Sequence, residues 1–335
     1  MSDAAERRPA VRRIAAGILL AGALAGGLRA QSTLFYLELQ AVGAMSTVSG
    51  RAQWFSLTPE DVMQKPSLGF DLVQRLSSRT RDVGVVAVQA RLAYDQDGDH
   101  TLQPQLFNAT FRLKTRPVNV WVGHSRPAMG LASVLDNHAL LLPDPTMFGF
   151  GFDRDWGIGI DRDFSWGGAA ASLTAGSGMP LYFKRNYLAA ARVFKGVLAR
   201  DNYSLGLSLA QGRLLETMGY TLMGPEPFAW ASAGLDGAFV WRNLENRAEV
   251  LVGRRAGSGT LLAFWRSGLS LLEEGRLKVE VQPALIRRAG QWTYALGSGL
   301  TVLVNADFTG RFMALYDRGR RDARFVLQLY YYKRI

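Results

Sequence analysis

Apolar and polar residues alternate along most of the chain from about residue 67 to the C-terminus. In the segment 108–114 (NATFRLK) every second residue is apolar, and the same pattern recurs in 277–282 (LKVEVQ) and 324–331 (RFVLQLYY). Successive side chains of a strand point to opposite faces. The pattern therefore predicts strands with one apolar and one polar face, and none of these segments has the 3.6-residue period of a helix.

Turn-forming residues separate these segments, for example Asp201-Asn202 and Glu273-Glu274-Gly275. Short links of this kind join neighbouring strands as hairpins. The candidate strands are 35–43, 48–56, 67–76, 82–95, 104–114, 118–125, 155–164, 166–175, 187–199, 203–213, 231–242, 246–255, 260–271, 276–288, 292–304, 308–317 and 323–333. The early ones are the least regular, so the pattern predicts about 16 strands within a range of 14–18.

A single antiparallel sheet of this size normally curls, splits or closes. Closure removes the unpaired edges, and inside a membrane it is compulsory because no water is available to them. We therefore expect an all-β fold, a closed antiparallel up-and-down transmembrane β-barrel over 31–335. The segment 130–147 interrupts the pattern with Pro143 and Pro145, and we expect it to be a long loop or one folded into the lumen.

The N-terminal 30 residues have a different pattern. Four arginines between Arg7 and Arg13 precede an uncharged apolar run over 14–28, and Ala30 offers a small residue for cleavage. This order is typical of a secretory signal peptide, so we expect residues 1–30 to be removed on export through the inner membrane. The remaining sequence contains no run of 18 apolar residues of the kind that forms a transmembrane helix.

Three features indicate that the apolar face points outward to lipid. About 16 strands are too many for a barrel filled by its own side chains, and such barrels enclose an aqueous lumen. Aromatic residues gather near the predicted strand ends, as at Trp54-Phe55 and Trp166, where membrane barrels carry aromatic girdles. The last strand is also aromatic, although the chain ends in Ile335. The expected location is the cell outer membrane of a Gram-negative bacterium, in contact with outer-membrane lipid.

Composition excludes several functions. The formal net charge is +11, but the basic residues are scattered rather than clustered, which argues against nucleic acid as a partner. The chain has no cysteine, which excludes disulfides, cysteine-ligated zinc and covalent c-type haem.

The stretch from Gln89 to Leu92 and the stretch from Val120 to Leu131 (VWVGHSRPAMGL) resemble the bacterial outer-membrane porin superfamily that includes phosphate-selective porins. In those proteins a strand likewise ends in a turn with proline, an apolar residue and glycine. The resemblance covers about a quarter of the chain and implies a divergent member with a 16-stranded barrel, passive permeation and a homotrimer. The lysine cluster of the phosphate-selective members has no match here, so phosphate is not implied as the solute.

Candidate chemistry is sparse. His124 and Ser125 are adjacent, so a strand directs them to opposite faces, whereas a catalytic pair on one face needs a spacing of two. Asp95, Asp97 and Asp99 surround Gly98 but lack the later glutamate of a calcium loop, and we interpret them as a hairpin turn. We expect no catalytic residue, no metal site, no cofactor and no enzymatic activity.

The polar strand faces carry the remaining functional candidates. The expected pore-lining residues are Arg91, Arg112, Lys114, Lys278, Glu280 and Arg311. Rings of Arg and Lys favour anions in a pore, so the sequence predicts a porin-like channel for passive diffusion of small hydrophilic solutes, with an anion preference as the finer hypothesis. The alternative is a barrel sleeve that holds a periplasmic or extracellular partner, for example a multihaem cytochrome in an electron conduit.

Overall fold

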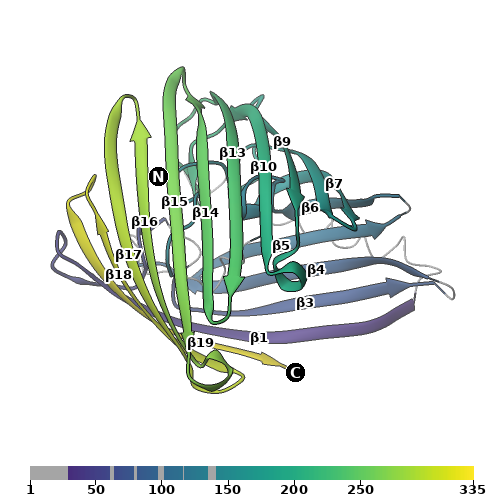
Figure 1. Ribbon diagram of the computed structural model, residues 1–335, viewed down its shortest axis with the longest axis horizontal. Helices are drawn as coiled ribbons and strands as arrows, with labels where there is room; N and C mark the ends of the chain where they lie inside the picture. Colours follow the sequence, from purple (N-terminus) through teal and green to yellow (C-terminus); the bar gives the residue numbers. More distant parts are fainter. Residues whose placement is uncertain (1–28, 61–63, 79–80, 97–101, 116, 135–140) are drawn as a thin grey trace, which may run out of the picture.

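The computed structural model describes residues 29–60, 64–78, 81–96, 102–115, 117–134 and 141–335, and strands dominate it (Figure 1). The strands are β1 Arg29–Ser46, β2 Ala52–Gln53, β3 Ser67–Ser77, β4 Asp82–Tyr94, β5 Leu102–Lys114, β6 Asn119–Ser125, β7 Asp155–Phe164, β8 Gly167–Thr174, β9 Tyr187–Lys195, β10 Tyr203–Leu214, β11 Thr217–Met218, β12 Thr221–Leu222, β13 Phe228–Trp241, β14 Leu244–Arg255, β15 Ser258–Leu271, β16 Leu277–Arg288, β17 Gln291–Leu303, β18 Phe308–Asp317 and β19 Asp322–Arg334. The helical turns are η1 Leu131–Ser133, α2 Leu198–Asp201 and η2 Glu273–Gly275. No helix in these ranges has the length and apolarity needed to cross a membrane.

The first and last strands close the sheet on itself. The N-terminal part of β1 pairs with β3, from Arg29 with Ser77 to Gln40 with Ser67. Its C-terminal part pairs with β19, up to Ser46 with Arg324. Every other neighbouring pair is also antiparallel, so within the described ranges sixteen strands form a closed barrel and β2 is a short addition to β1. The predicted fold class and strand number are confirmed.

One candidate strand, 48–56, is wrong. Only Ala52–Gln53 of this range is a strand, while each of the other sixteen candidate ranges overlaps one strand of the wall. The hydroxyls of Ser46 and Thr47 both donate to Oδ1 of Asp322, at 2.7 and 3.1 Å, and these bonds hold a turn at the end of β1. The chain then turns into the lumen, where Ser56 is completely buried.

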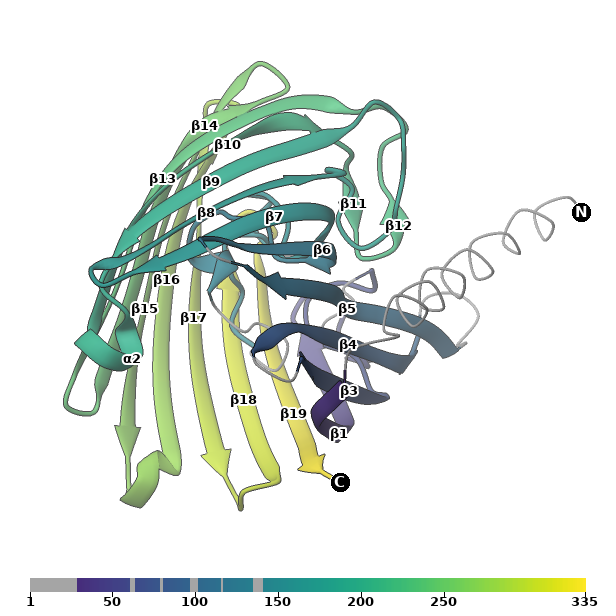
Figure 2. The same cartoon turned by 90° about the vertical axis from the view of Figure 1, so that its right-hand side faces the viewer.

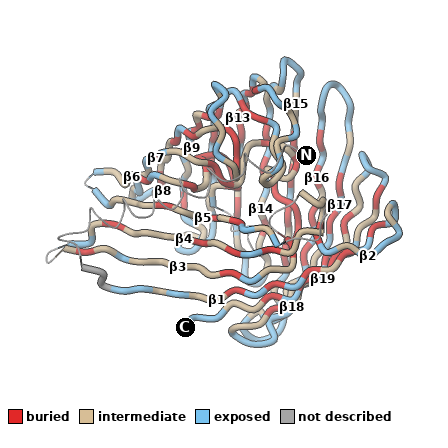
Figure 3. The backbone as a smooth tube through the Cα atoms, turned by 180° about the vertical axis from the view of Figure 1, so that it is seen from behind, coloured by how far each residue is buried: buried red, intermediate tan, exposed pale blue. Residues whose placement is uncertain are grey.

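The two faces of the wall differ as the alternation predicts. On β10, Leu205, Leu207 and Leu209 are exposed, whereas Gly206 and Ser208 between them are buried. Buried and exposed positions alternate in this way along the strands (Figure 3). The exposed leucines point outward, because Ser208 pairs with Arg192 and Arg192 lines the internal cavity. The outward face is therefore apolar.

The two ends of the barrel carry different connections. At the short-turn end lie the turns 165–166, 242–243 and 304–307, together with α2, Arg29 and the C-terminus. At the long-loop end lie the segments 47–66, 126–154, 175–186 and 215–227. Figure 2 shows α2 and the C-terminus at one end and the β11–β12 hairpin at the other. Membrane barrels have the same asymmetry, with short periplasmic turns and longer extracellular loops.

The outward face of β10 gives a direct test. Leu207→Arg places a charge in the middle of the apolar face, and we expect it to lower the free energy of unfolding in vesicles by about 2–4 kcal/mol. Gln211→Arg lies two positions from Leu209 on the same outward row, near the long-loop end, and we expect a cost of about 0–1 kcal/mol. Urea titrations of the two variants make the comparison, and equal costs would contradict a lipid-facing belt.

Candidate functional site

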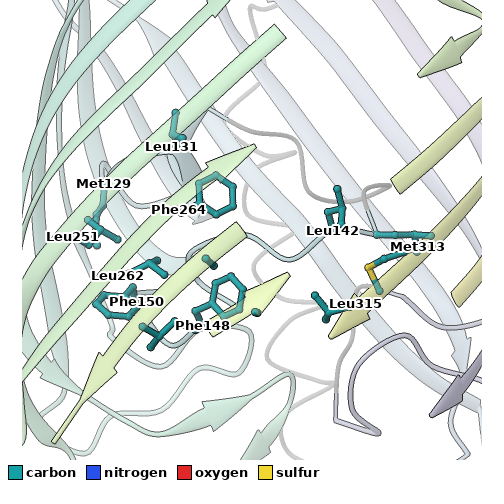
Figure 4. Close-up of a cluster of buried hydrophobic side chains, with 14 of the residues drawn as sticks. Met129, Leu131, Leu142, Phe148, Phe150, Leu251, Leu262, Phe264, Met313 and Leu315 are labelled. Atoms are coloured by element: carbon teal, nitrogen blue, oxygen red, sulfur yellow. The ribbon is translucent and has the colours of Figure 1, made fainter. Parts of the chain in front are cut away.

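The segment between β6 and β7, residues 126–154, crosses the lumen; its residues 135–140 lie outside the described part of the chain. Its apolar side chains pack against inward-facing residues of β14 to β18 (Figure 4). The packed residues of the segment are Met129, Leu131, Leu141, Leu142, Phe148 and Phe150, and the wall residues include Leu251, Leu262, Phe264, Ala284, Ile286, Met313 and Leu315. The lumen is thus narrowed by an apolar core of its own.

Hydrogen bonds from the wall fix the backbone of this segment. Arg266 on β15 donates from Nη2 to the carbonyl oxygen of Leu142 at 2.9 Å, and from Nε to Oε1 of Gln282 at 2.7 Å. Gln282 on β16 in turn donates to the carbonyl oxygen of Pro143 at 2.6 Å. On β14, Oε2 of Glu249 accepts from the backbone N–H of Leu131 at 3.2 Å. Polar side chains of the wall therefore satisfy backbone groups that burial would otherwise leave unpaired.

Two glycine positions make room for these contacts. Gly130 has a φ of 52°, and a Cβ there would lie 1.8 Å from Oε1 of Glu249. On β17, a Cβ at Gly297 would lie 2.7 Å from Cδ2 of Leu142. The glycines therefore let the segment approach the wall closely at β14 and at β17.

Asp144 stabilises a turn over residues 144–147 of the segment. Its Oδ1 accepts hydrogen bonds from the N–H groups of Thr146 and Met147, at 2.8 and 3.0 Å, and from the Thr146 hydroxyl at 2.6 Å. Burial, and then the negative charge of Asp153, raise the pKa of the Asp144 carboxyl above its ordinary value. The raised pKa reflects a carboxyl held away from water in order to stabilise this turn.

A cavity of about 660 Å³ remains beside the segment, lined by β3 to β9 and β19. Its lining combines both signs of charge with aromatic rings, and the charged members are Asp71, Arg112, Arg126, Arg154, Asp161, Asp163 and Arg192. Arg112 lies 2.9 Å from Asp161, and its side chain is 42% exposed. Arg192 makes a two-point contact with Asp236, with Nε 3.0 Å from Oδ2 and Nη2 2.5 Å from Oδ1. The cavity is therefore a polar, charged compartment inside the apolar cylinder.

The six candidate pore-lining residues are dispersed over the inner wall, and only Arg112 among them lines this cavity. Arg91 is buried, with its guanidinium 4.2 Å from the ring centre of Phe107 and 3.6 Å from Glu38. Lys114 lies 3.2 Å from Asp82 near the short-turn end.

The other three candidates lie on β16 and β18. Lys278 bridges Glu245 and Glu280, at 3.1 and 3.2 Å. Arg311 donates to Oε1 of Gln328 at 2.9 Å. Most of the six candidates are paired with neighbouring side chains of the wall. That they line the pore stays a prediction.

The sequence reasoning missed Arg192, Glu249, Arg266 and Gln282, which make the contacts described above. They occupy polar positions of predicted strands, as the six chosen residues do. Only the three-dimensional position of the segment 126–154 distinguishes the residues that hold it. The sequence pattern predicted that these residues lie on polar strand faces, but it did not predict which groups they contact.

Other segments cover part of the long-loop end. The hairpin β11–β12 reaches from β10 to β5, where the hydroxyl of Tyr220 accepts from the N–H of Leu106 at 2.6 Å. The Tyr220 ring packs with Met147 and Met179 against the fully buried Phe107. Burial raises the pKa of the Tyr220 phenol, so this contact holds the neutral form. The hairpin thus links connections that are far apart in the sequence.

The other candidate chemistry is not assembled into a site. Ser125 lines the cavity, whereas His124 is buried with its ring centre 5.0 Å from that of Trp156. Asp97 and Asp99 lie outside the described residues. Within the residues that the structure describes, no three metal-ligating side chains come together.

The lumen contacts predict the effect of removing one anchor. In Arg266→Gln the bond to the Leu142 carbonyl is lost, and a buried charged hydrogen bond contributes about 1.5–3 kcal/mol. We expect hydrogen exchange of the backbone amides over 144–150 to accelerate by roughly tenfold or more. Arg311→Gln removes a wall arginine bonded to Gln328 and should leave these amides unchanged. Equal acceleration in both variants would refute the anchoring role of Arg266.

The hairpin contact predicts a difference between two Tyr220 variants. The chain has no cysteine, so Met179→Cys introduces a single thiol within the Phe107 cluster. Tyr220→Ala removes both the ring and the hydroxyl, so we expect maleimide to label the thiol at position 179 at least several times faster than in the protein that keeps Tyr220. Tyr220→Phe keeps the ring and should have a smaller effect.

The same thiol reports on pH. Because the phenol pKa is raised, the stabilisation is complete below the unfolded pKa of about 10 and is lost as pH rises through the folded pKa. The labelling rate of the protein that keeps Tyr220, divided by the rate of the Tyr220→Phe variant, should therefore rise only at strongly alkaline pH. An acceleration at neutral pH would contradict a buried neutral phenol.

The barrel is similar to solved outer-membrane proteins over nearly its whole length. No protein-family model matches the sequence, and no curated protein matches it. An anion-selective porin from Comamonas acidovorans matches with a TM-score of 0.62 and 12% identity, covering 90% of this chain and 99% of that one. Salmonella typhi OmpF, in complex with daunomycin, gives a TM-score of 0.64 and 9% identity over 90% of this chain and 97% of that one.

OmpTdeltaL8, a loop deletion mutant of an outer membrane protein of Vibrio cholerae, gives a TM-score of 0.64 and 11% identity. The match covers 90% of this chain and 99% of that protein. Similarity at this level of identity establishes the fold. The chain therefore has the 16-stranded barrel fold of bacterial outer-membrane porins.

Proposed function

We propose that the chain is an outer-membrane channel through which small hydrophilic solutes diffuse passively. The observation that carries the proposal is the reversal of the usual protein pattern, with an apolar outer face around a charged internal cavity of about 660 Å³. A soluble barrel places its apolar residues inside, whereas a membrane barrel exposes them to lipid. The barrel fold shared with porins supports the same conclusion.

The mechanism is electrodiffusion past a constriction. The segment 126–154 narrows the lumen from the side of β14 to β18, and the charged cavity lies on the side of β3 to β9. A solute passing beside the segment meets Arg112, Asp161 and Asp163 in place of its hydration water. We assign no catalytic residue, metal or cofactor to this process.

The orientation follows from the two ends. The short turns and the C-terminus belong at the periplasmic side, and the long loops at the cell surface. Residues 1–30 are proposed to be the export signal, of which 1–28 lie outside the described residues. Cleavage after Ala30 would leave Gln31 as the first residue, two positions inside β1. N-terminal sequencing of the membrane-inserted protein checks this.

A homotrimer is proposed as the assembled form. A Vibrio cholerae outer membrane protein with the same fold, at a TM-score of 0.58 and 10% identity, is described in a trimer form. Unheated detergent gels and native mass spectrometry give the oligomeric state of this chain.

An anion preference is the finer proposal. Arg112 supports it, because its half-exposed side chain faces the cavity. The preference is expected to be weak, since Asp71, Asp161 and Asp163 line the same cavity. Arg112 is itself paired with Asp161, and Lys278 is paired with Glu245 and Glu280.

The sleeve for a partner protein is the second candidate, and the structure gives it less support. The lumen holds the chain's own segment 126–154, fixed by Arg266, Gln282 and Glu249. A partner inserted through the barrel would have to displace these contacts. Purified protein that is electrically silent and retains a second chain would favour the sleeve.

Planar bilayer recording tests the channel directly. The purified, detergent-refolded protein should insert in steps of defined conductance, and repeated failure of a correctly folded barrel to conduct would overturn the proposal. Correct folding is checked independently by the change in gel migration of the barrel on heating.

Selectivity depends on Arg112 in this account. Arg112→Gln removes a cavity cation and leaves Asp161 without this partner, so the anion-to-cation permeability ratio should fall to about half or less. Arg162→Gln removes the same charge from an exposed position on β7, outside the cavity lining, and should leave the ratio unchanged. Reversal potentials in a salt gradient measure both. A parent channel that prefers cations would refute the anion preference while leaving the channel itself intact.

A further inference from the structure

Three arginines stand at equivalent positions on the outer surface. Arg213, Arg254 and Arg287 each lie near the long-loop end of a strand, on β10, β14 and β16, and all three are exposed. Each lies on the outward row of its own strand: Arg213 comes after Leu209 and Gln211, Arg254 after Val252, and Arg287 after Leu285. One strand separates each arginine-bearing strand from the next. Neighbouring strands are about 4.8 Å apart, so the arginines recur about every 10 Å around the rim.

The depth of this arginine row coincides with one border of the apolar face. From Tyr203 to Arg213, β10 covers about ten residues, and at about 3.3 Å per residue and a tilt of about 40° this is about 25 Å, the height of a membrane barrel's apolar band. Arg287 lies 5.7 Å from the ring centre of Trp292, an exposed residue at the same end of β17. Tryptophan at that position is typical of a lipid–water boundary. The row therefore lies where lipid head groups begin.

The row is confined to one half of the barrel. On β1 and β8 the outward residues closest to the long-loop end are Met45 and Leu173, both exposed and apolar, and the outward row of β4 ends in Leu92 and Tyr94, which are uncharged. The charge of the row is also uncompensated, because no carboxylate of the described residues lies within 4.0 Å of the three guanidinium groups. By contrast, the nearby inward-facing Arg255 is paired with Glu216 at 2.5 Å.

We infer that the arginine row binds phosphate groups of lipid head groups in the outer leaflet, those of phosphorylated glycolipids in particular. A guanidinium group matches the phosphate geometry with two parallel hydrogen bonds. A phosphomonoester carries up to two negative charges and a phosphodiester only one, so uncompensated arginines favour the monoester. The inference rests on the membrane orientation proposed above, which places the long-loop end at the cell surface.

Native mass spectrometry of the folded barrel in detergent tests the inference. The probes are diphosphoryl lipid A, its dephosphorylated form, phosphatidylglycerol and inorganic phosphate. The test variant is Arg213→Gln/Arg254→Gln/Arg287→Gln. The control variant, Arg162→Gln/Lys195→Gln/Arg242→Gln, removes three exposed cations at the short-turn end.

We expect the parent and the control variant to retain diphosphoryl lipid A, and the test variant to retain at least fivefold less. The dephosphorylated lipid should bind all three proteins equally weakly, and phosphatidylglycerol should bind less than lipid A. Undiminished lipid A binding by the test variant would overturn the inference. Displacement of the lipid by millimolar inorganic phosphate would do so too, since it would indicate a site for free phosphate.

Bilayer recording separates this inference from the proposed channel. The test variant should conduct as the parent does, because none of its three positions lines the cavity. A parent that binds lipid A through the row but does not conduct would refute the channel and leave the lipid site standing. If the parent conducts but the test variant binds lipid A as well as the parent does, the lipid site would be refuted and the channel would stand.

Discussion

Closure of the backbone hydrogen-bond network is the constraint on which the rest of the structure depends. A strand edge in a membrane has no water to pair with, and β1 removes both edges by pairing with β3 along one part and with β19 along the other. Once the cylinder is closed, the two-residue period of each strand sorts side chains into an inner and an outer set. Exposed leucines on β10 and charged residues around the cavity are consequences of the same geometry.

The interior departs from a simple polar lining because the chain fills part of it. Leu262 and Phe264 on β15 face inward and pack on the segment 126–154, so β15 is apolar on both faces where the segment lies. Burying this apolar surface stabilises the segment, while Arg266 and Gln282 satisfy its carbonyl groups. The constriction is thus a small protein core built inside an aqueous pore, and its position leaves the charged cavity on the opposite wall.

Alternation predicted most of the wall because it depends only on local backbone geometry. The segment 108–114 shows this, since its polar residues Asn108 and Arg112 line the internal cavity as its pattern indicates. The prediction of a strand over 48–56 was wrong because the turn that precedes this range depends on bonds from Ser46 and Thr47 to Asp322, which lies more than 270 positions away. The anchors Glu249 and Arg266 were missed for the same reason, as no local pattern reveals which carbonyl a wall side chain meets. Charge pairing, as between Lys278 and Glu245, likewise becomes visible only across strands.

The most direct test concerns which way the two sets of side chains point. The chain has no native cysteine, so single cysteines at positions 205 to 210 of β10 can each carry a fluorophore in vesicles of brominated lipid. The account predicts strong quenching at 205, 207 and 209 and weak quenching at 206, 208 and 210. Quenching without this two-residue period, or with the opposite phase, would contradict an apolar cylinder with a charged interior.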